Sequence, residues 1–113
     1  MKTPWTLRAA LRFVRDLEWN LGNDFHVGLI GSVLINGWSE RDLDIVIYPH
    51  RRPARSLIVL HRMLHESGLK MLFDADEVKQ FWEKKELSHD RKHVEVWYTN
   101  KRPRRRVDIF LMR

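Results

Sequence analysis

The sequence has 113 residues, enough for one domain with a modest hydrophobic core and too few for two. Hydrophobic residues make up 43%, which argues against disorder, and the lack of cysteine excludes disulfides, thiolate zinc sites and cysteine nucleophiles. A net charge of +6 favours polyanionic partners. Without a signal-peptide pattern or an apolar run near the roughly 20 residues of a membrane span, we expect a protein of the reducing cytoplasm.

The first predicted element is an amphipathic helix. Thr3 and Pro4 suit its N-cap and first helical position, and Gly22 ends it. Between them, apolar residues recur at helical spacing: Leu7, Ala10, Leu11, Val14, Leu17 and Leu21. We therefore divide the single domain into an N-terminal helix in residues 1–24 and a core in residues 25–113.

The most informative stretch follows a short apolar strand predicted at Phe25–Ile30. Gly31 allows the backbone to turn sharply and to approach a ligand closely. Ser32 can cap a short helical segment at residues 33–36 and leave its N–H groups free for an anion. The sequence therefore predicts a phosphate site at Gly31-Ser32.

A loop is predicted at residues 36–41 from its Asn-Gly pair and its polar composition. Trp38 in this loop can stack on a base or fold back over the edge of the core. The sequence leaves both interpretations open.

The next strand, predicted from Asp42 to Tyr48 and ended by Pro49, carries two carboxylates on one face. Alternate residues of a strand share a face, so Asp42 and Asp44 project together while their apolar neighbours point into the core. Two like charges held this close favour a cation between them, and oxygen ligands suit Mg²⁺ or Mn²⁺. If this strand lies beside the one that ends at Ile30, the carboxylates face the phosphate site, an arrangement typical of phosphoryl transfer.

The middle of the chain is predicted to be supporting structure. A basic connector containing Arg51 and Arg52 leads to a helix at about residues 56–67. His61 and His65 stand one turn apart on this helix, but the zinc-protease motif needs glutamate where the chain has arginine. We therefore interpret both histidines as residues at the margin of the core.

A short strand at residues 69–73 and a third helix are predicted next. Asp74 and Glu77 form a capping box at the start of that helix. Its inward-facing residues are expected to be Val78, Phe81 and Trp82. The charged segment at residues 84–92 is expected to loop out.

The last part of the chain is predicted to be an antiparallel hairpin with strands at residues 93–99 and 104–112. Asp108 lies on the polar face of the last strand and is a third carboxylate. Four arginines crowd the hairpin, where they either contact a polyanion or neutralise the acidic site, and we favour the polyanion. With the two connector arginines, the candidate nucleic-acid-binding residues are Arg51, Arg52, Arg102, Arg104, Arg105 and Arg106.

Together these motifs resemble the polymerase β-type nucleotidyltransferase superfamily. Its pattern is Gly-Ser or Gly-Gly, a short gap, Asp-x-Asp or Asp-x-Glu, and a later strand with a third carboxylate. Here the pieces are Gly31-Ser32, nine intervening residues, Asp42-Leu43-Asp44, and Arg106-Val107-Asp108-Ile109. The last segment most resembles the third-carboxylate strand of family X DNA polymerases, and the resemblance covers the palm from about Phe25 to Leu111.

The resemblance implies transfer of a nucleoside monophosphate from an NTP or dNTP to an acceptor hydroxyl, with release of pyrophosphate. It implies two divalent ions, Mg²⁺ or Mn²⁺, both bridged by Asp42 and Asp44, with Asp108 on the catalytic ion and helping to activate the hydroxyl. It assigns Gly31 and Ser32 to the triphosphate. Glu95, which we expect to point outward from its strand, is the reserve candidate for the third carboxylate.

The sequence departs from the family pattern in two places. Many members carry Arg-Gly shortly after the Gly-Ser, where this chain has Leu34-Ile35-Asn36-Gly37. The sequence also ends directly after the Asp108 strand, so we expect no thumb and no templated synthesis by this chain alone. It could act untemplated, as a homodimer, or with a partner subunit.

We therefore predict an α/β (α+β) fold: a small mixed β-sheet with helices mainly on one face and the acidic site at its edge. The predicted function is metal-dependent nucleotidyl transfer. A nucleic-acid 3′ hydroxyl is the preferred acceptor because the chain is basic. Two alternatives stay open: transfer to a protein or a small molecule, and an inactive palm that binds nucleic acid.

Overall fold

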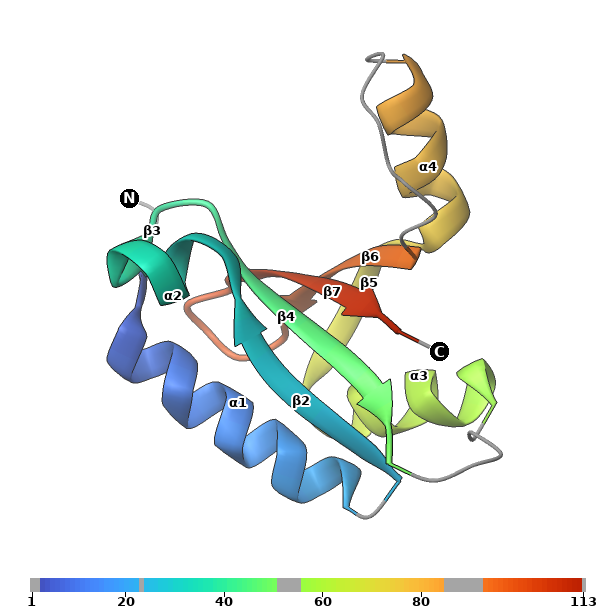
Figure 1. Ribbon diagram of the computed structural model, residues 1–113, viewed down its shortest axis with the longest axis horizontal. Coiled ribbons are helices and arrows are strands. Elements are labelled where there is room, and N and C mark those ends of the chain that lie inside the picture. The colour runs from blue at the N-terminus through green and yellow to red at the C-terminus, as the bar shows by residue number, and fades with distance from the viewer. Residues whose placement is uncertain (1–2, 23, 51–55, 85–92, 113) are drawn as a thin grey trace.

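The computed structural model describes residues 3–22, 24–50, 56–84 and 93–112, with the backbone alone at 81–84. Its centre is a five-stranded sheet in the order β2-β4-β7-β6-β5 (Figure 1). The strands are β2 (Phe25–Ile30), β4 (Asp42–Pro49), β5 (Leu69–Phe73), β6 (His93–Thr99) and β7 (Arg106–Leu111). The β4–β7 pair is parallel and the other three pairs are antiparallel, which confirms the predicted mixed sheet.

Two helices cover one face of this sheet, which we call the core face. They are α1 (Leu7–Leu21) and α3 (Leu57–Glu66), and Figure 1 shows both lying along the sheet. Their apolar stripes pack on alternate residues of the strands, as the periodicity predicts. The fully buried side chains of this core include Leu21, Leu43, Ile45, Ile47, Leu64, Trp97 and Ile109.

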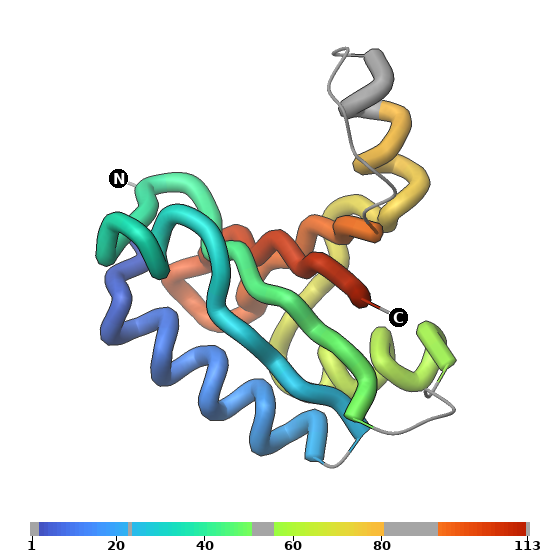
Figure 2. Tube along the Cα trace, viewed as in Figure 1, coloured from blue at the N-terminus to red at the C-terminus, as the bar shows by residue number. Residues whose placement is uncertain are grey.

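The opposite face, which we call the open face, is covered only in part by the described residues. There α4 (Ala75–Lys84) packs through Val78 on Val94, Val96 and Phe110. The trace in Figure 2 shows α4 extending away from one end of the sheet. The short helix α2 (Gly31–Asn36) contacts β2 and β4, so it lies at the β2 edge. The expectation that helices lie mainly on one face therefore holds for α1 and α3, with α4 on the other.

The start of the first helix differs from the prediction. Thr6, not Thr3, is the N-cap of α1, and its Oγ1 accepts a hydrogen bond from the Ala9 N–H at 3.1 Å. The preceding residues form a two-residue strand, β1 (Trp5–Thr6), which pairs with β3 (Trp38–Ser39) inside the predicted loop. Trp5 is buried and its Nε1 donates to the carbonyl of Arg106 at 2.9 Å. This distant contact holds the chain extended where the sequence predicts the first helical turn.

Several local signals are confirmed. Gly22 ends α1 with a φ of 63°, a conformation that glycine adopts without strain. The capping box before α4 has both its bonds, from the Glu77 N–H to Asp74 Oδ1 at 2.9 Å and from the Asp74 N–H to Glu77 Oε1 at 3.1 Å. The predictions for Arg51 and Arg52, for residues 85–92 and for the side chains of Phe81 and Trp82 lie outside the described residues.

No described helix has both the length and the apolar character needed to cross a membrane.

Candidate metal and nucleotide site

The register of β4 against β7 brings the predicted carboxylates together. In this parallel pair Asp42 lies beside Arg106 and Asp44 lies beside Asp108. Residues paired across neighbouring strands point to the same face, so all three carboxylates project from the open face. One oxygen atom of each lies within 4.8 Å of the others. The prediction that Asp42, Asp44 and Asp108 meet at one point therefore agrees with the geometry.

The cluster lies where apolar packing and solvent meet. Leu43 and Ile45, which alternate with the aspartates, are fully buried in the core. The Asp42 and Asp108 side chains keep 26% and 13% of their surface exposed. The carboxylates are thus partly desolvated on a rigid sheet and can still be reached by a ligand.

Burial raises the pKa of two of these carboxyl groups, Asp44 and Asp108. Burial, followed by the negative charges of Asp42 and Asp108, raises the pKa of Asp44 to about 7. Burial also raises the pKa of Asp108, although hydrogen bonding to Arg106 opposes this effect. Without a cation, the protein therefore holds Asp44 and Asp108 closer to protonation than ordinary aspartates.

Arg106 offsets part of this negative charge. Its Nε and Nη2 donate to the two oxygens of Asp108 at 2.8 and 3.2 Å, and its Nε lies 4.0 Å from Asp42 Oδ2. The hydrogen bond to Asp108 in turn raises the pKa of Arg106. A two-point ion pair of this kind fixes the Asp108 carboxylate in one orientation.

Gly31 lies against the cluster from the β2 side. Its φ is +78°, and a Cβ atom built there would lie 2.3 Å from Asp44 Oδ2. A side chain at position 31 would therefore displace the Asp44 carboxylate. The Gly31 backbone and the acidic cluster are in direct contact, as the paired motifs predict.

The role predicted for Ser32 as a helix cap is wrong. The helix α2 begins two residues earlier than predicted, at Gly31, and its N-cap is Ile30, which makes no side-chain capping bond. The Ser32 side chain is exposed in the first turn. Its hydroxyl therefore stays available to a ligand rather than to the helix backbone.

The donor set fits a hard divalent cation. Three carboxylates from two adjacent strands supply oxygen ligands, which Mg²⁺ and Mn²⁺ prefer over nitrogen or sulfur. The raised pKa of Asp44 comes in part from negative charge that a cation would neutralise. Asp42, Asp44 and Asp108 are thus the residues that could hold metal.

Comparison with known proteins gives structural matches alone. No family model matches the chain, and no curated protein matches it. Two structures of the Cid1 poly(U) polymerase match with TM-scores of 0.55 and 0.54 at 18% and 17% identity. One is described as bound to MgATP and the other as bound to Mg 3′-dATP. Both matches cover 92% of this chain.

The chain shares the fold of the matched part of the Cid1 poly(U) polymerase. It spans 30% and 29% of the length of the two matched Cid1 chains. The fold predicted from the Gly-Ser, Asp-x-Asp and third-carboxylate pattern is therefore confirmed.

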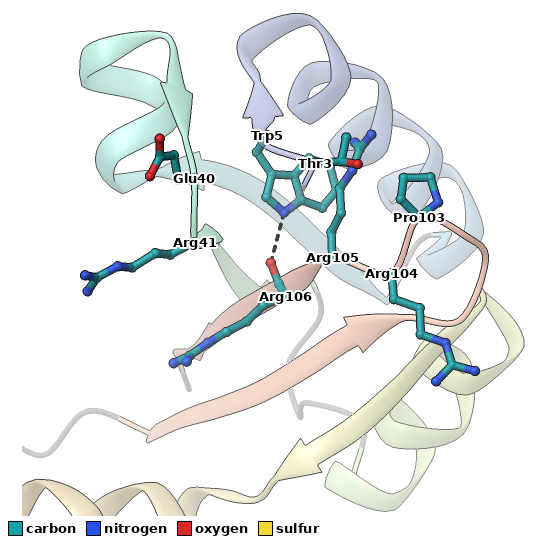
Figure 3. A pocket seen from close by; sticks show the side chains of 8 residues that line it. All are labelled: Thr3, Trp5, Glu40, Arg41, Pro103, Arg104, Arg105 and Arg106. Carbon is teal, nitrogen blue, oxygen red and sulfur yellow. Dashed lines mark hydrogen bonds between the residues drawn. The ribbon is translucent and has the colours of Figure 1, made fainter. Parts of the chain in front are cut away.

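The hairpin arginines have different surroundings. Arg104, Arg105 and Arg106 line a groove of about 460 Å³ next to the carboxylates, and Arg102 is exposed in the turn. The guanidinium of Arg105 lies 4.9 Å from the centre of the Trp5 ring. Figure 3 shows Arg105 turning back toward Trp5 while Arg106 extends away from it.

The expectation that Glu95 points outward is wrong. Its side chain is 1% exposed and points to the core face. Its oxygens accept from Trp97 Nε1 at 3.1 Å and lie 2.7 Å from His61 Nε2 and 3.6 Å from His93 Nε2. Glu95 therefore cannot replace Asp108 as the third carboxylate. His61 and His65 lie at the core margin against Trp97, as predicted.

Arg41 and Trp5 line the groove but were not predicted from the sequence as residues of the site. Arg41 precedes Asp42 directly and lines the groove together with Glu40. Its position next to the Asp-x-Asp motif was a usable signal. Trp5 forms another part of the groove wall, but it reaches this place through a contact with a residue 101 positions away, which no local pattern reveals.

Proposed function

We propose that this chain is a metal-dependent nucleotidyltransferase with a palm most like that of family X DNA polymerases. It moves a nucleoside monophosphate from an NTP or dNTP to an acceptor hydroxyl, preferably a nucleic-acid 3′ end. The observation that carries the proposal is the convergence of Asp42, Asp44 and Asp108 on a face where Gly31 touches Asp44. The matched Cid1 structures, described as bound to MgATP and Mg 3′-dATP, support an NTP as the donor.

Each residue has a role in this reaction. Asp42, Asp44 and Asp108 would hold two Mg²⁺ or Mn²⁺ ions. When bound, the ions supply positive charge to the phosphoryl oxygens and lower the pKa of the attacking hydroxyl. Gly31 and Ser32 hold the triphosphate, since the exposed Ser32 hydroxyl and the Gly31 backbone lie on the β2 side of the carboxylates.

The transfer step exchanges one bond at the α-phosphorus for another. The acceptor oxygen forms a bond to the α-phosphorus while the bond from that phosphorus to the oxygen bridging to the β-phosphate breaks. Pyrophosphate leaves with the electron pair, and Asp108 accepts the hydroxyl proton. Arg106 keeps the Asp108 carboxylate oriented for this proton transfer.

We also propose the cellular setting. The chain acts in the cytoplasm, which its lack of cysteine suits. Three modes of action are compatible with the proposal: untemplated transfer, action as a homodimer, and action with a partner subunit.

The experiment is incorporation of label from each α-labelled NTP and dNTP into single-stranded, duplex and tRNA-like acceptors with Mg²⁺ or Mn²⁺. Asp108→Asn removes a charge at the site, so we expect transfer to fall about 10³-fold with the circular dichroism spectrum unchanged. Asp16→Asn is the matched control, because Asp16 is exposed on α1 and its Oδ1 lies 3.8 Å from the Nε of the neighbouring Arg15. Near-normal transfer by Asp108→Asn would contradict the proposed site.

A second function is favoured by the Arg106–Asp108 ion pair, since an internal guanidinium already neutralises one carboxylate. In this alternative the chain is an inactive palm that binds nucleic acid. It requires salt-sensitive binding that survives Asp42→Asn and Asp44→Asn, with no label transferred to any acceptor. Label transferred to a protein or a small molecule alone would instead keep the chemistry and change the acceptor.

A further inference from the structure

A row of polar side chains crosses the open face and leads away from the carboxylates. The strand register pairs Asp42 with Arg106, Arg106 with Tyr98, and Tyr98 with Lys70. These four residues therefore lie side by side on β4, β7, β6 and β5, and they share a face with the metal-ligand candidates. Neighbouring strands are about 4.8 Å apart, so the part of the row from β7 to β5 spans roughly 10 Å.

Three cations are associated with this row. Lys70 is exposed, and the Arg106 side chain keeps 49% of its surface exposed. Arg104 joins them from the hairpin, with its guanidinium 5.7 Å from the centre of the Tyr98 ring. The ring thus supports the Arg104 guanidinium between the other two cations. We call Lys70, Tyr98, Arg104 and Arg106 the cationic row.

The cationic row lies on the side of the site that the donor does not need. The order β2-β4-β7-β6-β5 places Gly31 on one side of Asp44 and the cationic row on the other. The described part of α4 leaves the row uncovered, because Val78 packs on Val94, Val96 and Phe110 further along the strands. The groove at Arg104 and Arg106 adjoins the row, and Arg41 and Arg106 extend from it in the same direction (Figure 3).

We propose that the cationic row binds the phosphates at the 3′ end of a single-stranded polynucleotide, whose terminal hydroxyl then lies at Asp108. This inference rests on the proposed function, which assigns the other side of the carboxylates to the donor triphosphate. The cations lie in a single row, and the phosphates of a single-stranded nucleic acid also form a single row of negative charges. An acceptor that is a protein or a small molecule gives no reason for cations that continue to Lys70, two strands away from Arg106.

The test is fluorescence anisotropy of the full chain with 5′-labelled single-stranded oligonucleotides over a series of salt concentrations. We expect Lys70→Ala/Arg104→Ala to weaken binding about tenfold and to lower the slope of log K against log salt by about 1.4, since each single-strand phosphate contact contributes about 0.7. The matched control is Arg8→Ala/Arg12→Ala, which removes the same charge from exposed positions on α1, behind the core face. Thermal melts check that all variants fold, and Lys70→Arg/Arg104→Lys is expected to retain binding.

In the binding assay, three results would overturn the proposal: no oligonucleotide binding by the wild-type chain, equal losses in the two double variants, or tighter binding of duplex than of single strands. The transferase can fail separately. Row-dependent binding without any label transfer would refute the transferase and leave the cationic row standing. Label transfer unaffected by Lys70→Ala/Arg104→Ala would refute the cationic row and leave the transferase standing.

Discussion

The two faces of the central sheet hold carboxylates in opposite surroundings. On the core face, Glu95 is 1% exposed and is bonded to Trp97 and His61. On the open face, Asp42, Asp44 and Asp108 crowd within 4.8 Å, with the guanidinium of Arg106 alongside. One carboxylate is satisfied by partners, and the other three repel one another.

This difference in surroundings indicates a structural role for Glu95 and a functional role for the three aspartates. A buried carboxylate that meets hydrogen-bond donors stabilises the fold around it. Partly exposed like charges destabilise the site until a ligand relieves them, and such tension is typical of functional sites. Burial raises the pKa of Asp44, and the repulsion from Asp42 and Asp108 raises it further. Three substitutions test the contrast.

The largest effect on stability is expected on the core face. Glu95→Ala leaves the Trp97 indole N–H without its acceptor and removes the partner of His61, so we expect the free energy of unfolding to fall by about 3 kcal/mol. Urea unfolding measures this. Mg²⁺ or Mn²⁺ affinity, measured by calorimetry, is expected to stay at the wild-type level.

The control for this substitution is Glu95→Gln. It keeps the volume and an oxygen acceptor for Trp97, so it is expected to destabilise the fold far less than alanine. A Glu95→Ala variant that stays folded and loses metal binding would contradict the structural role of Glu95, because Glu95 would then belong to the acidic site.

A smaller effect, on ligand affinity, is expected at Gly31. In Gly31→Ala the new methyl group would lie 2.3 Å from Asp44 Oδ2, so the carboxylate must move. We expect metal affinity to fall about tenfold or more, as it does when the groups that position metal ligands are altered. Calorimetric titration with Mn²⁺ measures the change.

Gly37→Ala is the matched control for the backbone strain of this substitution. Gly37 also has a positive φ, +85°, but nothing lies within 4 Å of a Cβ atom built there. Both variants are expected to lose about 1 kcal/mol of stability from the strained φ. Equal metal affinities in the two variants would show that the contact between Gly31 and Asp44 has no part in the site.

Local patterns predicted most of the fold and the acidic site. The alternation of β4 placed Asp42 and Asp44 on one face, and the same rule placed Asp108 on the polar face of β7. Helix ends at Gly22 and at the Asp74–Glu77 capping box were also readable, because caps act within one turn. These features depend on neighbours in sequence, so the sequence alone reveals them.

The wrong predictions concern features that depend on contacts between residues far apart in the sequence. Val94 and Val96 flank Glu95 and pack under α4, so β6 is buried on both faces and its alternation could not show which face is the core. The true N-cap of α1 depends on Trp5, which is anchored to Arg106 across 101 residues. The position of Arg106 beside Asp42 depends on the β4–β7 register, which no short motif indicates.

The smallest expected effect is the change in stability when Asp44 is replaced by Asn, which removes one of the crowded negative charges. The pKa of Asp44 is raised from its ordinary value of 3.8 to about 7, so below about pH 4 the group is protonated in both the folded and the unfolded chain. Between pH 4 and 7 the unfolded chain ionises first, and the wild type loses stability relative to Asp44→Asn. A pKa unit corresponds to about 1.4 kcal/mol, but partial exposure of Asp44 to water reduces the gain we expect above pH 7 to about 1 kcal/mol.

Urea unfolding in EDTA at pH 4 and pH 8 measures this gain, which should be absent at the lower pH and present at the higher. Saturating Mg²⁺ should reverse the order at pH 8, because the wild type binds the ion in its folded state and Asp44→Asn binds it weakly. Asp16→Asn, on the exposed surface of α1, should follow the wild type in every condition. If Asp44→Asn is no more stable than the wild type at pH 8 in EDTA, the ionised Asp44 does not destabilise the folded state. The carboxylates of the two faces would then differ only in how deeply they are buried.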